Sequence, residues 1–283
     1  MNWITEYKIP FGHWMELFFD WLSLHAAGFF DAISTGLGAV ITSCINTMEW
    51  FPPIVIIIFT AAIAYALHRR WSLVIFVILA LLLILNLGYW EAMIETFVLV
   101  FIATFLSVII AIPIGIFAAH KPRVYTYLRP VLDLMQTVPT FVYLIPTLVL
   151  FGLGVVPGLI STIIFSIASP IRLTYLGIRK VPEELIEAGK AFGATPMKLL
   201  FKVELPAAMP NIMAGITQCI MLSLSMVVIS ALVGADGLGK PVVQALNTVN
   251  ISQGFEAGLC IVLVAMILDR LCKKSDNQQR DES

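Results

Sequence analysis

The sequence predicts an all-α polytopic membrane protein with about seven transmembrane helices. Of the 283 residues, 59% are hydrophobic and only 12% are charged, whereas soluble domains have roughly 25% charged residues. The apolar residues also fall into windows long enough to cross a bilayer, separated by short polar stretches. One soluble core could not hide so much apolar surface, so we expect the chain to lie in a membrane.

The expected spans follow from these apolar windows. They lie at 52–67, 71–89, 93–118, 134–153, 157–176, 210–233 and 255–271. The first window is short, so its ends are the least well defined. Together the spans form an expected transmembrane domain, residues 52–271.

Residues 1–51 precede the first span and contain two amphipathic segments. In 11–25 and again in 34–48, polar residues lie opposite apolar ones at helical spacing. We expect both segments to lie as helices in the outer membrane interface. An alternative is that 34–51 forms a further span.

The basic residues predict the orientation in the membrane. All 17 Lys and Arg residues except Lys8 and Lys240 fall on one side of the expected spans. Because basic residues favour the cytoplasmic side, the N-terminus is expected outside. The loop 177–209 and the polar tail 272–283 are expected in the cytoplasm, with no further domain after the tail.

Several classes of protein are disfavoured by what the sequence lacks. The net charge of −1 argues against a nucleic-acid partner. The four cysteines show no CxxC spacing, so we expect no metal site. The sequence contains no recognisable catalytic motif, so an enzyme is not expected. The middles of the spans also lack the ionisable residues that ion-coupled transporters place in the membrane. Uphill transport would therefore need energy from another chain; the alternative is an ion-gradient-driven secondary transporter or channel.

One segment is the best candidate for lining a translocation path. QTVPTFVYLIP places polar and aromatic side chains beside two prolines, and its candidate residues are Gln136, Thr137, Pro139, Phe141 and Tyr143. Backbone groups freed by proline must face protein or water in a membrane. Aromatic faces also suit a quaternary ammonium cation. The alternative is that these residues only pack helices together.

The loop 177–209 is a charged interruption that predicts two short helices. Pro182 suits a first helical position, acidic residues follow it, and Gly193 stands where a left-handed C-cap is needed. Thr195 then suits an N-cap before a second helix that runs until Pro206. The apolar residues of this segment favour a groove on a partner over a solvated loop.

The same segment resembles a known signature. Glu187-Ala188-Gly189, then Gly193, then Val203-Glu204-Leu205-Pro206 has the spacing of the EAA signature of bacterial ABC importer permeases. Gly189 and Val203 replace the usual alanine and isoleucine. The flanking sequence, over roughly residues 90–271, is similar to the permeases for glycine betaine, proline betaine and choline.

The resemblance implies a type I ABC importer permease of the bacterial inner membrane. It implies a homodimer with cytoplasmic ABC ATPase subunits and a separate extracytoplasmic substrate-binding protein, and no cofactor on this chain, because the ATPase uses the ATP. The implied ATPase-coupling residues are Glu187, Ala188, Gly189, Gly193, Leu205 and Pro206. The substrate stays open among choline, glycine betaine, proline betaine and carnitine, as does the choice between osmoprotection and nutrient uptake.

Overall fold

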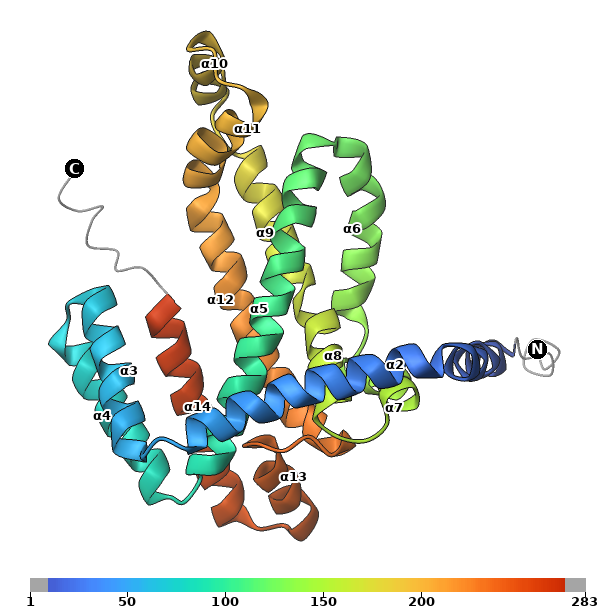
Figure 1. Ribbon diagram of the computed structural model, residues 1–283, viewed down its shortest axis with the longest axis vertical. Coiled ribbons are helices and arrows are strands. Elements are labelled where there is room, and N and C mark those ends of the chain that lie inside the picture. The colour runs from blue at the N-terminus through green and yellow to red at the C-terminus, as the bar shows by residue number, and fades with distance from the viewer. Residues whose placement is uncertain (1–9, 273–283) are drawn as a thin grey trace, which may run out of the picture.

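A computed structural model describes residues 10–272, and these residues form helices joined by short connections (Figure 1). The predicted tail beyond Cys272 lies outside the described residues. In chain order the elements are α2 (Phe11–Glu49), α3 (Pro53–His68), α4 (Trp71–Asn86), α5 (Trp90–His120), α6 (Pro122–Thr137), η1 (Thr140–Tyr143), α7 (Leu144–Phe151), α8 (Val155–Ser166), α9 (Ala168–Arg179), α10 (Glu183–Ala191), α11 (Pro196–Leu199), η2 (Leu200–Glu204), α12 (Leu205–Ser230), η3 (Ala231–Val233), α13 (Gly239–Thr248) and α14 (Ile251–Cys272).

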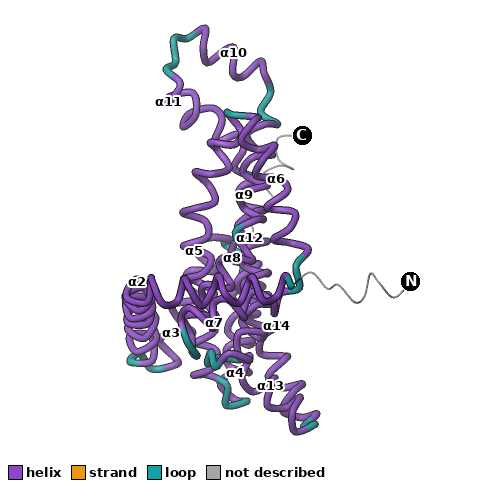
Figure 2. Tube along the Cα trace, turned by 90° about the vertical axis from the view of Figure 1, so that its right-hand side faces the viewer, coloured by secondary structure: helices purple, strands orange, loops and turns teal. Residues whose placement is uncertain are grey.

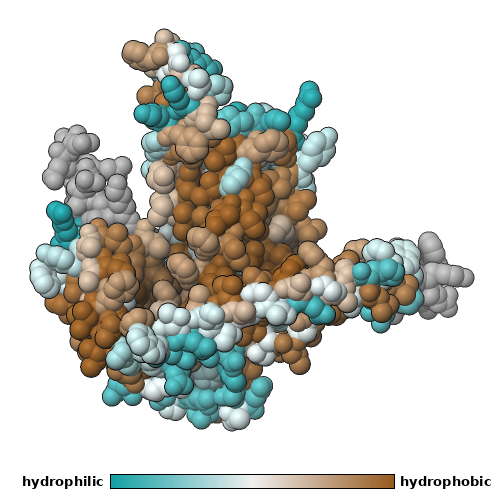
Figure 3. All heavy atoms as spheres, viewed as in Figure 1, coloured by the Kyte–Doolittle hydropathy of each residue, from teal (hydrophilic) through white to brown (hydrophobic). Residues whose placement is uncertain are grey.

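The predicted spans correspond to helices in six of the seven windows. By length and composition, the described residues contain five helices that could cross a membrane, or six with one bent pair. Helices α3 and α4 are apolar but have 16 residues each, about 24 Å, less than a hydrocarbon core of about 30 Å. Side chains on the outside of the bundle form a hydrophobic band between two hydrophilic ends (Figure 3).

The window 134–153 is not the single straight span that we predicted. Helix α6 ends at Thr137, and the chain then bends by 107° into η1 and α7. The cause is Pro139, which disfavours helical geometry in the residue before it. Val138 is accordingly extended, with φ −65° and ψ 131°.

Helix α2 is one 39-residue helix rather than two separate segments, with a kink at Ala26. It lies across the spanning helices, not along them, in the ribbon and in the Cα tube turned by 90° (Figures 1 and 2). Its length and composition would also allow it to span a membrane. The crosswise position favours the predicted interfacial helix.

The turns that carry basic residues point toward one end of the molecule. The α3–α4 turn, the α5–α6 turn, α10 with α11, and the C-terminal end of α14 all lie toward this end (Figure 1). The α4–α5, α7–α8 and α13–α14 connections lie toward the other end.

The core packs helices α5, α8, α9 and α12 closely through small residues. A methyl group added to Gly115 would lie 2.7 Å from Thr174 Cβ and 2.9 Å from the Ile171 carbonyl oxygen. Gly177 meets α12 in the same way, at Ala208 and Asn211. Such small residues let membrane helices approach each other.

We therefore expect Gly115→Leu to separate α5 from α9 and destabilise the protein by about 1–3 kcal/mol or more, as overpacked cores do. The measurement is the thermal unfolding midpoint in detergent. Gly258→Leu is the control, because Gly258 also lies in a spanning helix but has open space around it. Equal midpoints for the two variants would contradict this packing.

Candidate functional site

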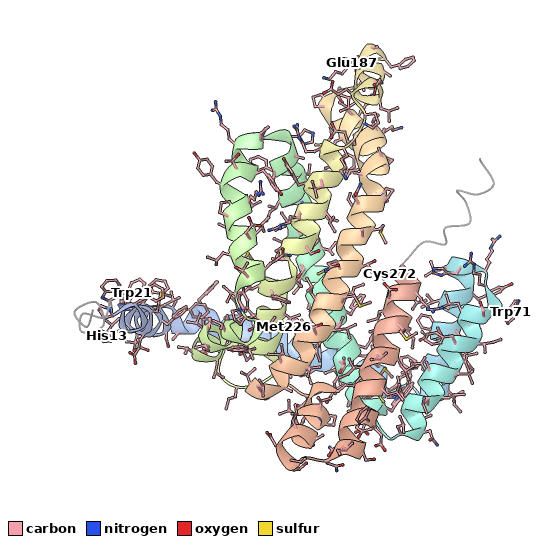
Figure 4. All side chains as sticks on the ribbon, turned by 180° about the vertical axis from the view of Figure 1, so that it is seen from behind. His13, Trp21, Trp71, Glu187, Met226 and Cys272 are labelled. Atoms are coloured by element: carbon pink, nitrogen blue, oxygen red, sulfur yellow. The ribbon has the colours of Figure 1, made fainter. Side chains whose placement is uncertain are left out.

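The predicted charged segment projects beyond the helix bundle at the basic end. Helices α10 and α11 form its tip (Figure 2), and Glu187 lies near the top of this projection (Figure 4). We call residues 180–204 the coupling segment. Its geometry decides which side chains a partner could touch.

Helix α10 begins and ends as the sequence predicts, within one residue. Pro182 is the residue before the helix rather than its first residue. Gly193 has φ +73°, and the Gly193 amide donates to the Lys190 carbonyl at 2.9 Å. The Ala194 amide reaches back to the Gly189 carbonyl at 3.1 Å. These two bonds form a Schellman motif, so the predicted left-handed turn is confirmed.

The second half of the coupling segment differs from the prediction. Thr195 does cap α11, its Oγ1 accepting from the Lys198 amide at 3.4 Å. The helix does not stop at Pro206, however, because α11 continues through the π-helical turn η2 into α12. A proline ring would clash with the carbonyl four residues earlier in a regular helix, and the wider turn relieves this clash. Leu205 and Pro206 therefore lie in the first turn of α12.

The signature residues have different surroundings. Glu187 and Ala188 are exposed, whereas Gly189 faces α11, where an added methyl group would lie 2.6 Å from Leu199 Cδ1. Gly189 thus lets α10 rest on α11 instead of offering a free contact.

Several large apolar side chains are exposed on the coupling segment, among its charged residues. Phe192 is 92% exposed, and Met197 and Phe201 are also mostly exposed. Exposed apolar side chains of this kind are candidates for contact with a partner. The signature itself did not include them.

The base of the coupling segment is tied to α5 by an ion pair that the sequence did not reveal. Glu204 is buried, and its Oε2 lies 2.9 Å from His120 Nε2 at the end of α5. His120 Nδ1 lies 2.9 Å from the Ile116 carbonyl oxygen. Both ring nitrogens thus lie close to oxygen atoms, but Glu204 Oε2 has no hydrogen-bond partner among the described residues, so its approach to His120 is a close contact without hydrogen-bond geometry. No local motif predicts contact between residues so far apart in the chain.

The candidate path residues gather at the bend between α6 and α7. Gln136, Thr137, Pro139 and Phe141 are exposed there. Tyr143 is half-buried, and its hydroxyl donates to the Met135 carbonyl at 2.6 Å. Tyr143 thus holds the bend, which leaves the other four as the residues open to a path.

The opposite end of the molecule has its own fixed loop between α12 and α13. The Leu238 amide donates to Thr96 Oγ1 at 2.8 Å, and Gly237, with φ +112°, leaves room for this contact. Lys240 Nζ donates to Asp236 Oδ1 at 2.6 Å. This bond raises the pKa of Lys240 above its usual value, so Lys240 stays charged at neutral pH.

Helices long and apolar enough to cross a membrane, with a charged segment projecting at one end, make this a polytopic membrane protein. The chain belongs to the family described as binding-protein-dependent transport system inner membrane component, which matches residues 111–277. It is therefore a multi-pass inner-membrane permease subunit of an ATP-driven importer, and ATP hydrolysis takes place in a separate subunit.

Relatives extend the match to nearly the whole chain. The chain is 45% identical to the glycine betaine transport system permease protein OpuAB of Bacillus subtilis, over 93% of each chain. It is 41% identical to the glycine betaine/carnitine transport permease protein GbuB of Listeria monocytogenes, over 97% of this chain and 98% of that protein. Its identity to the glycine betaine/proline betaine permease protein ProW of Escherichia coli is 39%, over 96% of this chain and 77% of ProW.

A solved structure shows the same fold. The inward-facing MetNI methionine ABC transporter superposes with a TM-score of 0.57 at 24% identity, over 66% of this chain and 93% of that one. The predicted importer permease fold is confirmed.

Proposed function

We propose that this chain is the permease of an importer for glycine betaine and related quaternary ammonium compounds. The similarity to OpuAB over 93% of both chains supports this most strongly. Further relatives are named for carnitine, proline betaine and trimethylamine N-oxide. Each of these compounds joins a fully substituted, positively charged nitrogen to a negatively charged oxygen. Choline lacks the negative oxygen and is the less favoured substrate.

The working assembly is a homodimer with two cytoplasmic ATPase subunits. The coupling segment is the surface that they contact, through Glu187, Ala188 and the exposed Phe192. Closure of the ATPases on ATP would draw the two coupling segments together. The continuous helical path through η2 into α12 and the pair His120–Glu204 would pass this movement to the bundle.

The orientation follows from the basic end of the molecule. Because the turns with basic residues point toward the coupling segment, this end lies in the cytoplasm. Helix α2 lies in the extracytoplasmic interface, with Trp14, Phe18 and Trp21 exposed to the headgroup region. A separate binding protein delivers substrate on that side.

The test is ATP hydrolysis by the purified complex in liposomes. We expect glycine betaine-loaded binding protein to raise the hydrolysis rate severalfold above the rate with empty binding protein. Absence of stimulation by any betaine would contradict the proposed substrate class.

A further inference from the structure

Helix α6 has a charged face at a depth where its neighbours are apolar. It runs beside the half of α5 next to the coupling segment (Figure 1), and α5 has no charged residue between Glu95 and His120. Leu132 of α6 packs against α5 and α9 in a small apolar cluster. The next residue, Asp133, has a side chain 51% exposed. A charged side chain in hydrocarbon costs about 2.5–3.5 kcal/mol, so this face meets water or protein instead of lipid.

Two arginines surround the Asp133 carboxylate. Arg172 Nη2 of α9 lies 2.5 Å from Asp133 Oδ1, and Arg129 Nε lies 3.8 Å from Asp133 Oδ2. Arg172 is mostly buried, and its Nε has no hydrogen-bond partner. The group therefore combines one carboxylate, two guanidinium groups and one N–H donor, Arg172 Nε, that makes no hydrogen bond.

A stacked pair of partly buried aromatic rings adjoins these charges. The rings of Tyr125 and Tyr175 stack face to face, with centroids 3.5 Å apart and an interplanar angle of 5°. Tyr125 precedes Arg129 by one helical turn, and Tyr175 follows Arg172 by one turn. The two rings and the three charges thus lie along the same seam between α6 and α9, which begins one turn from Gln136.

We propose that this seam is a transit subsite for the substrate at the cytoplasmic end of the translocation path. The inference rests on the proposed function, because its ligand is a zwitterion with a quaternary ammonium and a carboxylate. The ammonium group binds Asp133 and the outer face of Tyr125, since the inner face of this ring is covered by Tyr175. The carboxylate binds Arg172 and Arg129.

The paired charges explain how a zwitterion could enter and leave without a large penalty. When the substrate separates Asp133 from Arg172, its own two charges replace the lost partners, so neither charge is left unpaired. A simple cation such as choline would leave Arg172 unpaired. The subsite therefore favours betaines over choline.

The test compares variants of the assembled complex in liposomes. Arg172→Met is expected to lower glycine betaine uptake about tenfold, the effect of losing one charge-assisted hydrogen bond. The double variant Asp133→Arg with Arg172→Asp restores an ion pair with its direction reversed, and we expect uptake to stay low. Arg123→Met, which removes a charge from another face of α6, is the control and is expected to transport normally.

Normal uptake in the Arg172→Met variant, or restored uptake in the reversed pair, would overturn the subsite, since the pair would then only support the fold. If the wild-type complex takes up no betaine, the proposed function fails instead.

A labelling measurement checks the seam without relying on transport. In a variant whose native cysteines are replaced, Gln136→Cys is expected to react with a trimethylammonium-bearing thiol reagent added from the cytoplasmic side, and glycine betaine is expected to slow this reaction. Ile110→Cys, on the exposed apolar surface of α5, is expected to stay unlabelled. No reaction at position 136 would overturn the inference, because that face would not be open to water.

Discussion

Replacing Gly193 by valine is expected to reduce ATP-driven uptake by at least about tenfold, because tenfold corresponds to only 1.4 kcal/mol. The residue has φ +73° and ends α10 through the two backbone bonds to Lys190 and Gly189. A side chain in this left-handed geometry costs about 1–2 kcal/mol, more when it is β-branched. Valine would therefore open the turn and move α10, with Glu187 and Phe192, away from its docking position.

The measurements for this variant are uptake and co-purification of the ATPase subunits. Membrane insertion should be unchanged, because open space surrounds Gly193 and the spanning helices lie elsewhere. Gly193→Asn is the matched control, since asparagine tolerates the left-handed conformation, and it should keep most of the activity. An equal loss of uptake in the Gly193→Val and Gly193→Asn variants would mean that the left-handed turn geometry does not determine coupling.

Replacing His120 by alanine is expected to be the second most damaging change. Glu204 is buried, and its Oε2 has the His120 imidazole 2.9 Å away but no hydrogen bond. Removing the imidazole would take away this neighbour and leave the buried carboxylate less compensated, which we expect to cost about 1–3 kcal/mol. The coupling segment would then be free to move without moving α5. We expect uptake to fall about tenfold, with ATP hydrolysis less dependent on loaded binding protein.

His25→Ala provides a control with the same local geometry. His25 Nδ1 also lies 2.9 Å from the carbonyl oxygen four residues earlier, that of Trp21, but the His25 ring stacks on the Trp21 ring instead of contacting a carboxylate. Its loss should leave coupling unchanged. If His120→Ala transports as well as His25→Ala, the ion pair does not carry the movement.

Local features of the coupling segment could be predicted because they depend on neighbours in the chain. The turn at Gly193 and the cap at Thr195 follow from backbone geometry that few residues adopt. The end of the second helix could not be predicted from Pro206, because a π-helical turn accommodates the proline. The functional roles of Glu187 and its neighbours stay predictions.

For the candidate path, too, the sequence predicted local features and the structure decided the rest. Pro139 marks the break between α6 and α7, but only the structure gives the 107° bend. As an aromatic residue beside a proline, Tyr143 was predicted to line the path. Its hydroxyl instead donates to the Met135 carbonyl oxygen and so stabilises the bend. Arg172 and Asp133 are 39 residues apart, and no periodicity joins them.

The sequence alone determined the membrane class, the apolar windows, the charged segment and its signature, because composition, hydropathy and caps act over a few neighbouring residues. Only the tertiary structure decided that α2 lies crosswise, that Glu204 meets His120, and that α6 and α9 share a charged seam. These features depend on contacts between distant residues. Which distant residues meet depends on how the helices pack, and packing at Gly115 or Gly177 is set by shape rather than by any pattern in the chain.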